Sequence, residues 1–183
     1  MICLAFKADP PIEAEFSELS PELKEQYAEN AWYLLELIDQ LPGQENRKVD
    51  AAQLQEWVEA VRQECANRNR SSIGDSHIGK LLSHSPVGSD GVWPHEAVRG
   101  VIEGCENQDL DRGIEFGIYN QRGVVTKSLR EGGKQEHELV EKYKQQAEEI
   151  QYIHPRTAAM LRRIAGRYKR DGAREDINVE LRD

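Results

Sequence analysis

Apolar side chains recur every three or four residues along most of this 183-residue chain, and that spacing restricts the possible folds more than any other feature. The period matches one face of an α-helix, whereas a half-buried strand would show strict alternation of apolar and polar residues. Prolines and glycines separate the periodic segments. The sequence therefore predicts an all-α fold of six or seven helices, arranged as a bundle or as irregular stacked helical hairpins.

The first two predicted helices have clear start and stop signals. Ser20-Pro21-Glu22 supplies a capping hydroxyl, a proline that needs no amide partner and an acid in the first turn, and Pro42-Gly43 ends the helix. The second helix begins at Asp50, which forms a capping-box pattern with Gln53, and its apolar stripe extends to Cys65. A short polar loop separates the two, so we expect an antiparallel hairpin. The stripe of the first helix, expected to face inward, consists of Tyr27, Ala31, Leu34, Leu35, Ile38 and Leu41.

The rest of the chain continues the helical pattern. Gly123 is placed to cap one of these later helices, and Val124-Val125-Thr126 is the only hint of β structure. Residues 1–19 contain Asp9-Pro10-Pro11 and should form an extended N-terminal segment. Residues 20–183 should then form a single all-helical domain with a charged C-terminal helix. The five later helices are expected at residues 72–83, 94–105, 110–119 and 134–150, and from 155 onward.

Charge and cysteine content narrow the class of function. The chain has 33 acidic and 24 basic residues and a net charge of -9, which disfavours broad electrostatic binding to nucleic acid or anionic lipid. Three cysteines, far apart and odd in number, form neither a disulfide framework nor a zinc signature, and they indicate a reducing compartment. No apolar run is long enough to span a membrane, and the apolar start is too short for a signal peptide. We expect a cytoplasmic protein without a cofactor.

Several short motifs form a recognisable pattern along the chain. They are Ile78–Pro86 (IGKLLSHSP), Asp90–Arg99 (DGVWPHEAVR), Gly117–Val124 (GIYNQRGV), Pro155–Ala159 (PRTAA) and Arg174–Asp176 (RED). Together they resemble the C-terminal region of a family of large, uncharacterised bacterial proteins, and the resemblance covers nearly the whole chain. It implies a chain similar to the terminal piece of something larger, as a separate subunit, an internal-start product or a trimmed fragment. The apolar start would then be the last stretch of a preceding module. The resemblance implies no particular chemistry.

One polar cluster has the residue types of hydrolytic metal sites and of general acid–base catalysis. His77 and His84 are seven residues apart and could share a helix face, but no established metal-binding spacing occurs. Local roles in turns and in the first turn after Pro94 explain the cluster better. We therefore predict neither catalytic nor metal-binding residues among its members, which are Asp75, His77, His84, Asp90, His95 and Glu96.

The last predicted helix carries a basic run with one acid among its members. Arg163, Arg167 and Arg170 are spaced so that they could line one face and contact phosphates. Ion pairing with the acidic helix at residues 134–150 is the favoured alternative, because the chain as a whole is acidic. The complete run is Arg156, Arg162, Arg163, Arg167, Lys169, Arg170 and Arg174.

Three tryptophans could pack in the core or mark an interface, where this residue type is enriched. Trp93 is the best interface candidate, because it lies in a turn-rich loop before a helix, whereas Trp57 belongs to the apolar stripe of the second helix and Trp32 lies within the first helix. A partner or nucleic-acid surface would accordingly include Trp93, Arg163, Arg167 and Arg170.

The leading hypothesis is a non-enzymatic helical domain that works by protein–protein contact, as a subunit or terminal module of a larger bacterial assembly. The partner would be a larger subunit or a second copy of the chain. The alternative is an accessory domain that contacts nucleic acid through the basic last helix. A hydrolase or metal enzyme built on His77, His84 and His95 is a third and weaker hypothesis.

Overall fold

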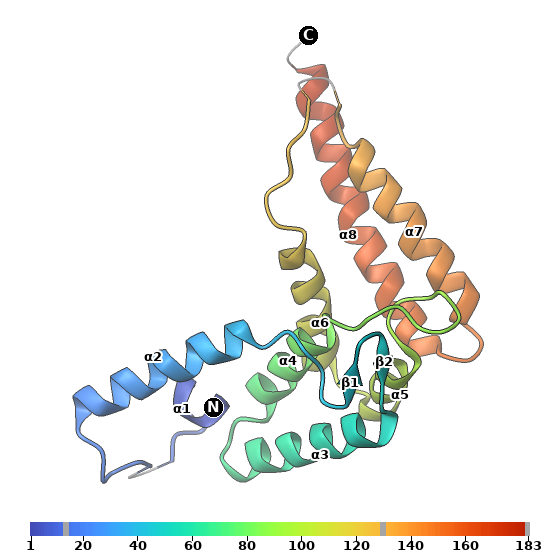
Figure 1. Cartoon of the computed structure of the whole chain (residues 1–183). Helices are drawn as coiled ribbons and strands as arrows, with labels where there is room; N and C mark the ends of the chain where they lie inside the picture. The colour runs from blue at the N-terminus through green and yellow to red at the C-terminus, as the bar shows by residue number, and fades with distance from the viewer. Residues whose placement is uncertain (13–14, 129–130, 182–183) are drawn as a thin grey trace.

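The protein is mostly helical, with 66% of residues in helices, as the sequence predicts. The computed structural model describes residues 1–12, 15–128 and 131–181, and Figure 1 shows the arrangement of their helices. Within this part of the chain there are eight helices and one antiparallel pair of two-residue strands, β1 (Gln44–Glu45) and β2 (Lys48–Val49). The helices are α1 (Ile2–Ala5), α2 (Pro21–Leu37), α3 (Ala51–Asn67), α4 (Ser71–Leu82), α5 (Glu96–Cys105), α6 (Gln108–Gln121), α7 (Lys134–Ile150) and α8 (Pro155–Glu180).

Side-chain caps start four of these helices, α2, α3, α5 and α6. Ser20 Oγ accepts a hydrogen bond from the Leu23 amide at 3.3 Å, and Asp50 accepts one from the Gln53 amide at 2.9 Å. Asn107 caps α6 in the same way, accepting from the Asp109 amide at 2.7 Å. Each cap satisfies a backbone donor that the first turn of a helix leaves unpaired. The sequence signals that predicted the starts of α2 and α3 are therefore confirmed.

The core is built around two pairs of packed helices, α4 with α6 and α7 with α8. Figure 1 shows α7 and α8 side by side and running away from the group formed by α3 to α6. The rings of Tyr143 on α7 and Tyr168 on α8 stack with their centroids 6.0 Å apart. Leu161 and Ile114, from α8 and α6, are both completely buried in the same core cluster. The charged C-terminal half of α8 continues as helix to Glu180.

The α4–α6 pair packs so closely that only glycine fits at the contact. A Cβ atom on Gly79 would lie 2.1 Å from the Leu110 carbonyl oxygen, and one on Gly113 would lie 2.2 Å from that of Ser76. These separations are far below van der Waals contact. The two helices thus approach each other at the backbone, because neither carries a side chain at the crossing.

Besides the end of α2, which lies at Leu37 and not at Pro42-Gly43, three sequence predictions differ from the structure. Residues 1–19 were expected to be extended or irregular, but Ile2–Ala5 forms one helical turn that packs on α2. The polar loop between α2 and α3 contains the short pair β1–β2, whereas residues 124–126 form no strand. The third difference, the packing of α2 and α3, is larger.

The expected antiparallel hairpin of α2 on α3 is not formed. The principal helix contact of α2 is with α1, whereas α3 packs against α4 and α5. Leu54 and Val58 of α3 are completely buried in the main core, so the apolar stripe of α3 is already covered. Periodicity identified the apolar face of each helix but could not show which element would cover it. The predicted stripe of α2 is therefore divided, with Tyr27 43% and Leu34 51% exposed, whereas Ala31 and Leu41 are buried.

We expect Gly113→Ala to lower the free energy of unfolding by about 2–3 kcal/mol, because the new methyl group forces apart two helix backbones. Gly100→Ala is the matched control, since Gly100 is exposed on α5 and a Cβ there meets nothing within 4 Å. This control should raise stability by about 0.5–1 kcal/mol through helix propensity alone. Urea unfolding followed by circular dichroism measures both. Equal effects of the two substitutions would contradict the close α4–α6 contact.

Candidate functional site

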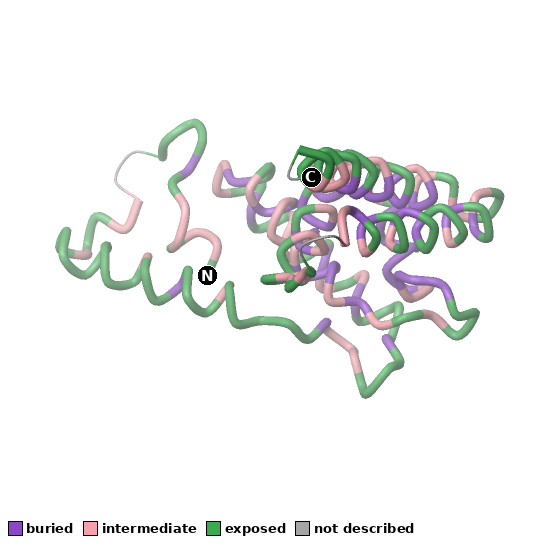
Figure 2. The backbone as a smooth tube through the Cα atoms, turned by 90° about the horizontal axis from the view of Figure 1, so that it is seen from above, coloured by how far each residue is buried: buried purple, intermediate pink, exposed green. Residues whose placement is uncertain are grey.

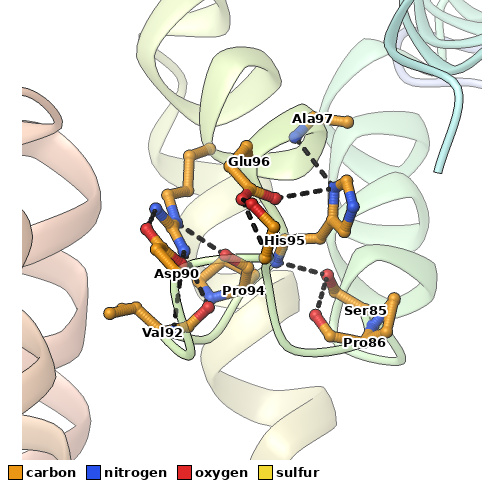
Figure 3. Close-up of polar contacts among 10 residues, drawn as sticks. Ser85, Pro86, Asp90, Val92, Pro94, His95, Glu96 and Ala97 are labelled. Atoms are coloured by element: carbon orange, nitrogen blue, oxygen red, sulfur yellow. Dashed lines mark hydrogen bonds and ion pairs between the residues drawn. The ribbon is translucent and has the colours of Figure 1, made fainter. Parts of the chain in front are cut away.

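The six residues of the predicted polar cluster separate into different environments. Asp90, His95 and Glu96 lie together at the start of α5 (Figure 3). Asp75 is buried on α4, where it accepts a hydrogen bond from Arg62 Nε at 2.8 Å. His77 packs against the Phe6 ring at the N-terminus, and His84 lies beyond the end of α4. Within the described part of the chain, no three His, Cys, Asp or Glu residues are grouped so that they could hold a metal ion.

Asp90 and Arg99 form a structural ion pair that closes the loop before α5. Arg99 is 1% exposed, and its guanidinium donates to both Asp90 oxygens at 2.6 and 2.8 Å. It also donates to the backbone oxygens of Val92 and Pro94, so that its donors bind the loop from within. These hydrogen bonds from Arg99 lower the pKa of Asp90 to about 2. The pair thus explains the burial of an arginine at the core.

His95 and Glu96 have local roles as well. His95 Nδ1 accepts a hydrogen bond from the Ala97 amide at 3.2 Å and so caps α5. Glu96 accepts hydrogen bonds from the amide and hydroxyl of Ser89, at 2.8 and 2.5 Å. These two hydrogen bonds hold the loop residue Ser89 against the first turn of α5. Figure 3 shows these contacts as a set that fastens the loop to α5.

Three arginines of α8 were expected to form a basic surface. Two of them contact α6, and the third is exposed to solvent. Arg163 donates to Glu115 at 2.6 Å and to Asp111 at 2.9 Å. The guanidinium of Arg167 lies 3.7 Å from the centroid of the Tyr119 ring, whereas Arg170 is exposed. Ion pairing was the favoured interpretation, but the partner helix is α6 and not the expected acidic helix α7. The reason is geometric, because the apolar stripe of α8 already faces α7.

Trp93 lies in the core and not on the surface expected for it. It is 7% exposed, and its indole nitrogen donates to the Ser85 carbonyl at 2.9 Å. Its ring meets the Tyr143 ring edge-on, with centroids 6.2 Å apart. Trp32 on α2 is instead 44% exposed, and Trp57 lines a pocket. The tryptophan in the turn-rich loop is therefore a packed core residue, whereas the more accessible Trp32 lies on α2 outside the predicted apolar stripe.

Helix α2 lies at the edge of the molecule beside the N-terminus (Figure 2) and carries several exposed large apolar side chains. Large side chains along this helix remain 41–75% exposed although they repeat at helical spacing. A helix normally directs such a stripe into a core, and contiguous exposed patches are typical of binding sites. We name as the α2 face the exposed, contiguous group Leu23, Tyr27, Tyr33, Leu34 and Leu37.

A pocket of about 350 Å³ lies beneath α1, between this turn and helices α2, α3 and α4. We call it the α1 pocket. Its walls are mostly apolar, and its few polar residues are Cys3, Glu64, Cys65, His77 and Lys80. The apolar lining comprises Met1, Ile2, Leu35, Ile38, Trp57, Ala60, Val61, Ile78 and Leu81.

A buried arginine holds the N-terminal segment over this pocket. Arg70 is 4% exposed and donates to the carbonyl oxygens of Cys3 and Phe6, at 3.1 and 2.8 Å. It also pairs with the Glu15 carboxylate at 2.6 and 3.0 Å. A backbone hydrogen bond from Asp9 to Asn69 supports the same junction. The segment is therefore attached at defined points, and α1 forms a fixed roof.

The apolar N-terminus was recognisable in the sequence, but neither the pocket nor the role of Arg70 was. The pattern around Arg70 resembles an ordinary polar helix end, and its partners are more than 50 positions away in the sequence. No local signal could have revealed them.

No protein-family model, curated protein or solved structure matches the chain. Among the described residues, no helix is both long and apolar enough to cross a membrane.

Asp90→Asn tests the ion pair with Arg99. A carboxyl whose folded pKa is depressed stabilises the fold above its unfolded pKa, and this contribution is lost as pH falls. For Asp90 the loss should occur between about pH 4 and pH 2. At pH 7 the variant should be about 1–2 kcal/mol less stable, because Arg99 loses a partner while water screens the 44% exposed Asp90 side chain.

Denaturant unfolding at several pH values measures this difference from wild type, which should shrink towards pH 2. Glu141→Gln removes an exposed ion pair with Lys144 and should leave stability almost unchanged. A difference for Asp90→Asn that stays constant down to pH 2 would exclude the proposed linkage.

Arg70→Met should release the N-terminal segment without unfolding the helical core, because its principal hydrogen bonds join that segment to the α3–α4 junction. We expect amide hydrogen exchange in residues 1–12 to accelerate by at least tenfold, while α7 and α8 stay protected. Arg68→Gln is the matched control, since Arg68 is 42% exposed at its side chain and pairs mainly with Glu64. Equal exchange in both variants would show that Arg70 does not hold the segment.

Proposed function

We propose that this protein is a non-enzymatic helical domain that binds a protein partner through the α2 face. The exposure of large apolar side chains along that face is the observation that carries the proposal. Their helical spacing suits a mode of recognition in which one helix lays its apolar side into a groove of the partner. Burying such side chains contributes up to about 1.5–3 kcal/mol each, so a few of them suffice for specific binding.

The charge of α2 indicates the chemistry of the partner. Glu22, Glu25, Glu29 and Glu36 lie on this helix with Lys24 as its only base. A second copy of the chain would bring two such helices together, and each chain has a net charge of -9. Like charges across an interface oppose association, whereas basic groups beside an apolar groove would favour it. We therefore infer a different protein as the partner, with an apolar groove flanked by lysine or arginine.

The wider assignment follows from this surface. We propose a cytoplasmic subunit or terminal module of a larger bacterial assembly, as the resemblance to the C-terminal region of large bacterial proteins implies. The helices would form irregular stacked hairpins and not a regular bundle. A non-enzymatic role is supported by the local contacts of Asp90, His95 and Glu96, which act as an ion pair, a cap and a loop anchor.

Nucleic-acid binding through α8 is the alternative, and the geometry supports it less. Arg163 already pairs with two carboxylates on α6, and Arg167 stacks on Tyr119. Phosphate contact by either arginine would have to break these interactions. Arg170 is exposed, and Arg163 is exposed as well but is held by its carboxylate partners on α6.

The Leu34→Ser/Leu37→Ser double variant tests the protein-partner proposal. We expect recovery of a nuclease-resistant partner to fall at least tenfold, because each truncation removes an exposed anchor of the α2 face. The measurement is a tagged pull-down at endogenous level from the cells that naturally make the protein, read by mass spectrometry with and without nuclease. Both side chains are more than half exposed, so the fold should remain intact.

The matched control is Tyr152→Ser/Ile153→Ser, which removes two exposed apolar side chains from the turn between α7 and α8. It should leave the partner bound. A partner retained by the Leu34/Leu37 variant would contradict the proposal. Recovery of nuclease-sensitive partners alone would assign binding to nucleic acid instead.

A further inference from the structure

The α1 pocket has the size and the walls of a small-molecule site. Its volume of about 350 Å³ lies at the lower end of the range for ligand pockets, roughly 300–1,000 Å³. Such pockets combine an apolar lining with a few polar groups, and here four separate helices contribute to the lining. The indole of Trp57 is the aromatic part of this lining, together with aliphatic side chains from α2 and α4.

We propose that the α1 pocket binds a small, uncharged and largely apolar molecule. The occupant carries an aromatic or aliphatic body that packs on Trp57 and one polar atom that reaches His77. This binding site is separate from the α2 face, and the inference goes beyond the proposed protein-partner function.

The charges around the pocket argue for an uncharged occupant. Lys80 pairs with Glu36, and Glu64 pairs with Arg68, so each charged residue of the lining already has an opposite charge. Burial and the neighbouring Lys80 lower the pKa of His77, and burial raises the pKa of the Cys65 thiol. Both side chains are therefore neutral at pH 7. A charged ligand would lose its hydration without gaining a free counter-charge.

His77 is the polar group placed to orient the ligand. Its ring packs against Phe6 with centroids 4.7 Å apart, and it makes no hydrogen bond with any described residue. A neutral imidazole has one donor and one acceptor nitrogen. A hydroxyl, amine or carbonyl of the ligand can therefore form a hydrogen bond with His77 without displacing an existing partner in the chain.

The roof of the pocket is held in a way that leaves the space beneath it open. Arg70 and Asn69 fasten the N-terminal segment by hydrogen bonds and an ion pair at the α3–α4 junction. The position of α1 therefore does not depend on its side chains filling the pocket. An occupant can enter against α3 and α4 while these anchoring contacts remain in place.

Titration with N-phenyl-1-naphthylamine, a neutral aromatic amine whose fluorescence rises in apolar surroundings, tests the proposal. We expect saturable binding of one molecule per chain. The anionic relative 1-anilinonaphthalene-8-sulfonate should bind at least tenfold more weakly, because its sulfonate cannot be neutralised in the pocket. Absence of saturable binding, or equal binding of the two probes, would overturn the proposal.

Ala60→Phe provides the site-specific arm of the experiment. Ala60 lines the pocket from α3 but is itself exposed, so a larger side chain there can block the space without unfolding the core. We expect affinity for N-phenyl-1-naphthylamine to fall at least tenfold, with an unchanged thermal melt. Arg70→Met should also weaken binding, because it loosens the roof.

The Leu34→Ser/Leu37→Ser variant is the matched control, and it should bind the neutral probe as wild type does. Loss of probe binding in this control would place the probe on the α2 face and overturn the pocket proposal. Unchanged probe binding in Ala60→Phe would overturn it as well. If Ala60→Phe released the protein partner and left probe binding unchanged, the pocket would accept a partner side chain and not a small molecule.

Discussion

The contact between α4 and α6 is the constraint on which the other features depend. The two helices meet at their backbones, because Gly79 and Gly113 leave no side chain between them. The opposite side of α4 then forms the floor of the α1 pocket with Ile78 and Leu81. α6 also presents Asp111 to the arginines of α8. A single close crossing therefore places both the pocket and the α8 ion pairs.

Helix positions could be read from the sequence, because the signals that set them are local. A capping residue such as Ser20 or Asp50 acts on an amide three residues away, and the predicted starts of α2 and α3 agree with the structure. Which element covers each apolar face depends on residues that are distant in the sequence. Two amphipathic helices joined by a short loop usually cover each other, but here the core covers α3 and leaves α2 open. The α2 face was therefore only partly visible in the sequence, because Tyr27 and Leu34 belong to the predicted inward stripe, whereas Leu23, Tyr33 and Leu37 do not.

For the polar residues too, the sequence indicated contacts with nearby positions but not contacts with distant ones. His95 and Glu96 bind groups within seven positions, so the interpretation of them as helix-start and turn residues was accessible from the sequence. Arg70 and Arg163 bind groups roughly 50 or more positions away, and the sequence offered no sign of those partners. Residue type alone suggested metal chemistry for the histidines and phosphate contact for the arginines. The interatomic distances in the structure show instead that most of these side chains bind other residues of the same chain.

The two proposed binding surfaces share one helix, and this gives them a physical connection. Leu35 and Ile38 line the α1 pocket, whereas Leu34 and Leu37 belong to the α2 face. A molecule in the pocket contacts α1, α2 and α4 together and so restrains the motion of α2 relative to the core. A partner that binds an already restrained helix loses less conformational entropy. If a ligand in the pocket strengthens binding of the partner by some factor, thermodynamic linkage requires the partner to strengthen binding of the ligand by the same factor. Occupancy of the pocket and occupancy of the α2 face would then rise together.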